Sequence, residues 1–96
     1  MSFIQNSSPK REIFDNLVQL LNSKKFNELE KQLNELIEQY PKSYPLYSLQ
    51  GAYMKIIGDF NKAELAFTEA IKINSKIPDA YNNLGLLYAE QKKIDA

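Results

Sequence analysis

A repeat of 34 residues constrains the fold of this 96-residue chain more strongly than any other feature of its sequence. Tyr47 and Tyr81 are separated by 34 positions, and so are Gly51 and Gly85. The same interval joins three further apolar positions, Phe26, Phe60 and Ile94. A fixed period of this length is typical of supersecondary units that stack side by side, because one unit cannot bury its apolar face alone.

Within each period the apolar residues recur every three or four positions, which is the spacing of one helix face. This pattern predicts helices near residues 9–23, 26–39, 44–57, 60–73 and 78–91, and the start of a sixth helix at about Ile94. Asn27 with Glu30, and Asn61 with Glu64, have the spacing of a helix N-cap and its third residue, so we expect both pairs at helix starts. No segment has the alternation of a strand, so the sequence predicts an all-α solenoid of antiparallel helix hairpins.

The composition excludes several classes of function. Twelve basic and twelve acidic side chains give a formal charge of zero, and cysteine and histidine are absent. The chain therefore has no disulfides, no typical zinc ligands and no imidazole base, and we expect neither catalysis nor a metal or other cofactor. A neutral chain also lacks the basic face that nucleic acids require. No stretch is apolar enough to span a membrane and no secretory signal is visible, which predicts a cytoplasmic protein.

Two of the periods carry a distinctive motif. Residues 81–88 read Tyr-x-x-Leu-Gly-x-x-Tyr, and residues 63–67 read Ala-x-x-x-Phe. On these residues the chain resembles the tetratricopeptide repeat family, which implies a right-handed α-solenoid of about two and a half repeats. In such a repeat, glycine and alanine let two helices approach closely, and aromatic side chains fill the remaining space. The residues expected to pack the repeats are Tyr47, Gly51, Phe60, Ala63, Phe67, Ala70, Tyr81, Leu84, Gly85 and Tyr88.

The resemblance divides the chain into an N-terminal extension (1–9), a degenerate first repeat (10–43), a second repeat (44–77) and an incomplete third repeat (78–96). The third repeat would hold its first helix and only the start of its second helix. Tyr88 and Leu84 would then lack the partners that Phe67 and Ala63 provide one period earlier. We therefore expect the N-terminal segment of a larger, bacterial-type protein, and possible self-association through the incomplete end.

The expected binding surface is the concave groove lined by the first helix of each hairpin, where solenoids of this kind hold peptides or helices. The predicted groove residues are Phe14, Val18, Leu21, Ser48, Leu49, Ala52, Lys55, Asn82, Asn83 and Leu86. The two asparagines can hydrogen-bond to a peptide backbone, or they can be ordinary surface residues. The three apolar residues from the first helix either form a wall for a ligand or are covered by the Phe3–Ile4 segment.

Two functions of different classes agree with these patterns. The favoured one is a non-catalytic protein-interaction module that binds a peptide or a partner domain in the groove. The alternative is a substrate-docking or regulatory arm of a larger enzyme, because the run Tyr-Asn-Asn-Leu-Gly at residues 81–85 resembles arms that precede glycosyltransferase or sulfotransferase domains. The carboxylate clamp that some members of the family use is not expected, since Asp79 would repel a carboxylate.

Overall fold

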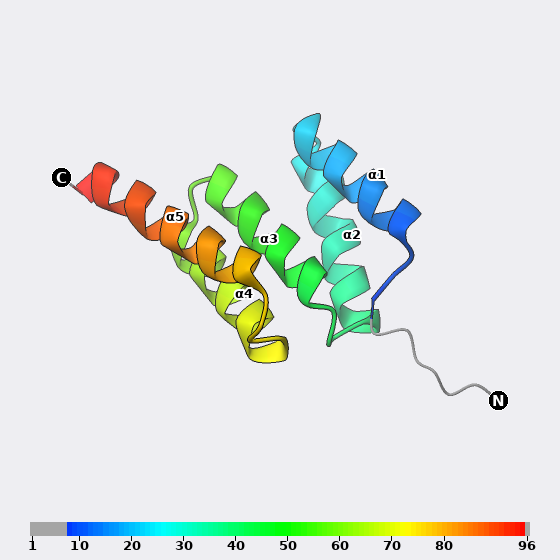
Figure 1. Cartoon of the computed structure of the whole chain (residues 1–96). Helices are drawn as coiled ribbons and strands as arrows, with labels where there is room; N and C mark the ends of the chain where they lie inside the picture. The colour runs from blue at the N-terminus through cyan, green and yellow to red at the C-terminus, as the bar shows by residue number, and fades with distance from the viewer. Residues whose placement is uncertain (1–7, 96) are drawn as a thin grey trace.

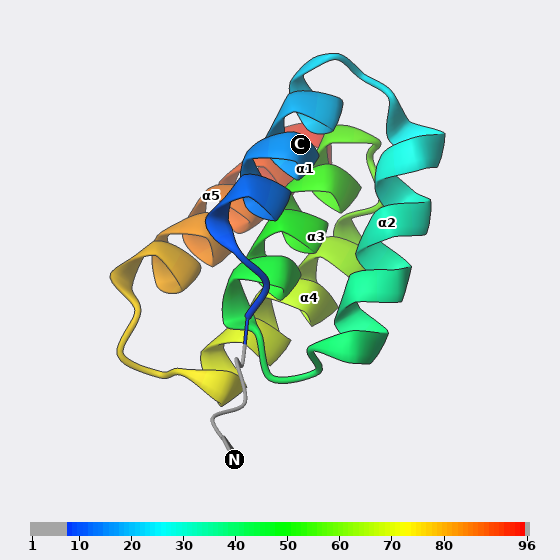
Figure 2. The ribbon, with the colours of Figure 1, turned by 90° about the vertical axis from the view of Figure 1, so that its right-hand side faces the viewer.

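The structure is a computed structural model that describes residues 8–95, and these residues form five helices and no strand. The helices are α1 (Arg11–Asn22), α2 (Phe26–Gln39), α3 (Tyr44–Ile56), α4 (Phe60–Ile73) and α5 (Pro78–Asp95). Successive helices pack as antiparallel neighbours (Figure 1), and together they form an elongated slab of 55 × 30 × 17 Å. Figure 2 shows α2 and α5 on opposite sides of this slab. The predicted all-α fold of stacked helix hairpins is confirmed.

The two hairpins close through the same kind of turn. In the α1–α2 turn the Lys25 N–H donates to the Leu20 carbonyl (2.9 Å), and in the α3–α4 turn the Asp59 N–H donates to the Met54 carbonyl (2.8 Å). This bond to the fifth preceding residue is the signature of a Schellman motif, which requires a left-handed residue just before the donor. The residues with positive φ are Lys24 (60°) and Gly58 (90°). The hairpin turn therefore recurs with the sequence period.

The start of α4 differs from the capping that the sequence predicts. Asp59, and not Asn61, is the N-cap residue, and its side chain accepts a hydrogen bond from the Lys62 N–H (3.2 Å). Asn27 and Asn61 lie one residue inside α2 and α4, because each helix begins at the preceding phenylalanine. The prediction was wrong because the spacing of cap and acid fits more than one position near a helix start.

The core consists of two clusters that run along the slab. The first holds Leu17, Leu29, Leu33, Leu46 and Tyr53, from α1, α2 and α3. The second holds Ala63, Phe67 and Leu87, from α4 and α5. Each helix packs mainly against its neighbours in sequence. This distribution of contacts is that of a solenoid, in which each repeat contacts only the next one.

Two tyrosines join the second helix of one hairpin to the first helix of the next. The Tyr53 hydroxyl donates to the Glu30 carboxylate (2.7 Å), and the Tyr88 hydroxyl donates to the Glu64 carboxylate. The two glutamates are 34 residues apart, so this link between hairpins also follows the period. Burial, followed by the hydrogen bond to Glu30, raises the pKa of Tyr53 to about 12. The sequence predicted these glutamates as capping residues, but they connect hairpins.

Helix α5 differs from the prediction at both its end and its outer face. We expected a turn after residue 91 and a new helix at Ile94, but α5 continues without a break to Asp95. The segment Gln91-Lys92-Lys93 contains no glycine or proline that would stop a helix. Tyr81, Gly85 and Tyr88 were predicted to pack, but all three are exposed. The Tyr88 hydroxyl reaches Glu64 of α4, whereas a Cβ at Gly85 would meet no neighbour within 4 Å in the described residues. The repeat boundaries and self-association through this end stay predictions.

Candidate functional site

A cavity of about 450 Å³ lies in the groove between α1, α3 and α5, on the face where the sequence predicts binding. Its walls come from three helices and from the residue before α5, and most of them are apolar. The lining residues are Phe14, Val18, Tyr44, Pro45, Ser48, Leu49, Ala52, Ile77, Asp79 and Asn83. The periodic sequence thus brings together residues that are as much as 69 positions apart, because the first helices of successive hairpins line the same side of the slab.

Buried contacts at the start of α1 fix one wall of this groove. The Ser8 hydroxyl and the Ser43 hydroxyl are hydrogen-bonded (2.7 Å), and Ser43 is fully buried immediately before α3. Pro9, between Ser8 and α1, is buried as well. These contacts hold the N-terminal end of α1 beside the N-terminal end of α3. Phe14 and Val18, which are one helical turn apart, therefore face the cavity on the α1 side.

Six of the ten predicted groove residues line this cavity, namely Phe14, Val18, Ser48, Leu49, Ala52 and Asn83. Leu21 instead packs against the first core cluster. Lys55 pairs with Glu90 across the contact between α3 and α5 (3.2 Å), while Asn82 and Leu86 are exposed beside the cavity and do not line it. The expected cover of this wall, the Phe3–Ile4 segment, lies outside the described residues.

The charged and amide groups of the groove lie on its α5 side. Asp79 and Asn83 are four residues apart, so both side chains point from the same face of α5. Asp79 is the one charged residue among those that line the cavity. Ser48 adds a hydroxyl from α3. The groove therefore combines an apolar wall on α1 and α3 with an acid and an amide on α5.

The comparison with protein families matches the C-terminal third of the chain. Residues 66–96, which include the end of α4 and all of α5, match the family model described as tetratricopeptide repeat. Residues 66–96 are therefore similar to a tetratricopeptide repeat. Neither the curated proteins nor the solved structures that were compared gave a match. The tetratricopeptide repeat is typically a non-catalytic scaffold for protein–protein interaction, which is the general role that the match supports for this chain.

The described residues contain no group of three or more acidic, histidine or cysteine side chains that could hold a metal ion. Their helices also lack the length and apolar character that crossing a membrane would require. The side chains that line the groove offer apolar packing, hydrogen bonds from Ser48 and Asn83, and the charge of Asp79.

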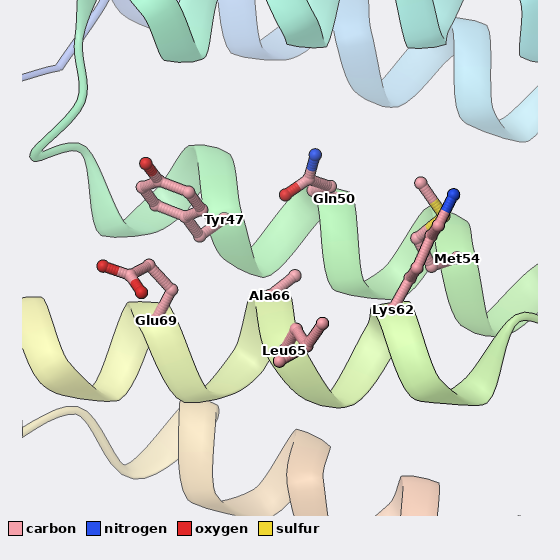
Figure 3. A pocket seen from close by; sticks show the side chains of 7 residues that line it. All are labelled: Tyr47, Gln50, Met54, Lys62, Leu65, Ala66 and Glu69. Carbon is pink, nitrogen blue, oxygen red and sulfur yellow. The ribbon is translucent and has the colours of Figure 1, made fainter.

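A second cavity, of about 340 Å³, lies between α3 and α4, outside the groove (Figure 3). Tyr47 and Glu69 lie at one end of the cavity, and Met54 and Lys62 lie at the other end. Burial, with a smaller effect of Glu69, raises the pKa of Tyr47. Leu65 borders the cavity and is 70% exposed. Sequence reasoning missed this cavity, although Leu65 gave a signal as an apolar residue outside the packing face of its helix.

Proposed function

We propose that this chain is a non-catalytic interaction module that holds a peptide, or an extended segment of a partner domain, in the groove between α1, α3 and α5. One observation carries the proposal. Six residues that the repeat pattern predicts for the groove, from α1, α3 and α5, line a single cavity. The volume of that cavity is sufficient for a few side chains of a ligand rather than for a whole domain. The tetratricopeptide repeat in residues 66–96 supports the same role.

The chemistry of the groove suits a peptide better than a small polar molecule. Phe14 and Val18 offer apolar surface, and Val18 is 42% exposed, so a ligand side chain that covers it gains free energy by removing that surface from water. Ser48 and Asn83 can donate to and accept from a peptide backbone. Asn82 does not line the cavity, so of the two asparagines only Asn83 is expected to contribute.

The experiment is to fill the groove with a neutral side chain and measure peptide binding. Short peptides with blocked ends are screened on an array with the wild-type chain, and the best binders are titrated by fluorescence anisotropy. Ala52→Gln places a longer side chain in the cavity, whereas Ala89→Gln makes the same change at an exposed position of α5 that does not line it. We expect Ala52→Gln to weaken binding about ten-fold or more and Ala89→Gln to leave it unchanged.

The same titrations distinguish the two asparagines. We expect Asn83→Ala to weaken binding by a few fold and Asn82→Ala to have no effect. Circular dichroism checks that each variant keeps its helix content. The proposal is wrong if the array captures no peptide, or if Ala52→Gln and Ala89→Gln bind the selected peptides equally well. The role as an arm of a larger enzyme stays a prediction.

A further inference from the structure

We propose that the groove selects ligands in which a basic group, an arginine or lysine side chain, lies next to an apolar side chain. The inference rests on the proposed function and names the class of peptide that the groove binds. It depends on the balance of charges around the cavity and on the positions of the apolar wall and the acid. The occupant is a basic–apolar peptide segment, with its cationic side chain at Asp79 and its apolar side chain against Phe14 and Val18.

The charges along the groove leave one acid without a basic neighbour. Asp79 is exposed at the cavity, and the described residues offer no lysine or arginine within ion-pair distance of it. The ammonium group of Lys55 pairs instead with the Glu90 carboxylate, at 3.2 Å. The ion pair neutralises the one lysine predicted to lie in the groove. A ligand therefore meets a negative charge that no residue of the wall compensates.

The dipole of α5 opposes this charge only in part. Pro78 is the first residue of α5, so the carboxylate of Asp79 lies in the first turn, near the free N–H groups of the helix. A helix N-terminus carries about half a positive charge, whereas the carboxylate carries one full negative charge. Among the residues that line the cavity, Asp79 and the helix terminus together leave a net negative charge. An anionic ligand is therefore disfavoured there, and a cationic one is favoured.

The apolar wall fixes where the rest of the ligand binds. Phe14, Val18 and Leu49 border the cavity from α1 and α3, while Asp79 borders it from α5. A ligand that spans the cavity must present an apolar side chain to one side and a basic side chain to the other. An extended peptide does this with neighbouring residues, because successive side chains point in opposite directions. Asn83, one turn from Asp79, can bond to the peptide backbone between the two side chains.

The test uses three pools of short peptides with blocked ends, identical in their random apolar positions and different at one fixed position. That position is arginine, glutamine or glutamate. Binding of each pool to the wild-type chain is measured by fluorescence anisotropy. We expect the arginine pool to bind about three-fold more tightly than the glutamine pool and about ten-fold more tightly than the glutamate pool, because an exposed charge pair changes affinity by only a few fold.

Two variants and one matched control locate the effect. Asp79→Asn should remove the preference for arginine over glutamine, and Asp79→Lys should favour the glutamate pool. Glu12→Gln removes an acid from the first turn of α1, at a position that does not line the cavity, and should keep the full preference for arginine. The preference should also shrink between about 50 mM and about 500 mM salt, since the charges are exposed.

The outcomes separate this inference from the proposed function. If the three pools bind equally well and Ala52→Gln still weakens their binding, the groove binds peptides but the charge selection is wrong. If Glu12→Gln removes the preference for arginine as fully as Asp79→Asn does, the preference comes from the net charge of the chain and not from the groove. That result also overturns the inference. If no pool binds to the wild-type chain, the proposed function itself fails. Asp79→Asn retains the shape of the side chain, so its result does not depend on whether Asp79→Lys folds.

Discussion

Helices α3 and α5 occupy the same place in the 34-residue period, but their surroundings differ. A second helix, α4, packs along the glycine face of α3, and the Phe67 ring fills the space above Gly51. The corresponding face of α5 carries Gly85, and nothing in the described part of the chain lies within 4 Å of a Cβ built there. Equivalent glycines thus have a packing role in one helix and none in the other.

The difference shows what the repeated motif encodes. Gly51 is required by the close approach of an aromatic ring, whereas Gly85 has the same sequence context without that ring. A glycine inside a helix costs up to about 1 kcal/mol of stability relative to alanine. At Gly85 no packed neighbour within the described residues offsets this cost. The motif therefore specifies a contact between two helices, and the contact exists only where both helices are present.

The largest expected effect of breaking this contact comes from Phe67→Ala. The ring is fully buried between α3, α4 and α5, so its removal leaves a cavity and should lower the free energy of unfolding by about 3–5 kcal/mol. Tyr81→Ala on the outer face of α5 removes a ring that is 50% exposed and should cost about 1 kcal/mol or less. Urea unfolding followed by circular dichroism measures both, because the chain has no tryptophan. Equal losses would show that the two faces do not differ.

A smaller but sharper test replaces the two glycines. A Cβ at Gly51 would lie 2.5 Å from Cδ1 and 2.8 Å from Cζ of the Phe67 ring, and the buried ring has little room to move. Gly51→Ala should therefore destabilise the fold by about 1–2 kcal/mol, the cost of overpacking less the gain in helix propensity. Gly85→Ala meets no neighbour and should stabilise the fold by up to about 1 kcal/mol. The comparison fails if the two substitutions change the urea midpoint in the same direction.

The smallest effect concerns the two tyrosine–glutamate bonds and depends on pH. Because the pKa of Tyr53 is raised to about 12 in the folded chain, its contribution to stability is complete below the unfolded value near 10 and is lost as the pH rises through 12. Wild type should therefore lose more stability than Tyr53→Phe between these pH values, but by less than about 1 kcal/mol, because the hydroxyl is only partly buried and water screens its bond to Glu30. The hydrogen bond to Glu64 also raises the pKa of Tyr88, but this hydroxyl is exposed, so Tyr88→Phe should follow the wild-type curve. Thermal unfolding at a series of alkaline pH values measures this difference in stability. Identical pH dependence for wild type and Tyr53→Phe would contradict the prediction.

Much of the fold follows from local patterns in the sequence. The bounds predicted for two of the helices, 26–39 and 60–73, agree with α2 and α4, because each begins at an apolar residue after a turn with a left-handed residue. The predicted end of the fifth helix was wrong, since the period suggested a turn where residues 91–93 contain nothing that breaks a helix. Period and local propensity disagreed there, and local propensity decided the structure.

The groove was partly predictable for a similar reason. Phe14, Ser48 and Asn83 were found because equivalent positions of successive first helices must line one side of a solenoid. The prediction that Leu21 lines the groove was wrong. Leu21 lies near the end of α1, and its side chain packs against the first core cluster. The Tyr53–Glu30 bond and the cavity between α3 and α4 depend on the distance between two helices. The spacing of residues along a single helix does not determine that distance, so the sequence pattern could not predict them.

The wall of the groove is also part of the core. Phe14 and Leu49 line the cavity and at the same time pack against the first buried cluster. A ligand held against them adds contacts to the folded state that the unfolded chain cannot make, so occupancy and folding are thermodynamically linked. The first hairpin, which packs less closely than the second, gains most from this linkage. If the groove binds a peptide as proposed, saturating it should slow amide exchange in α1 more than in α4, so that binding would be detected as a change in local stability.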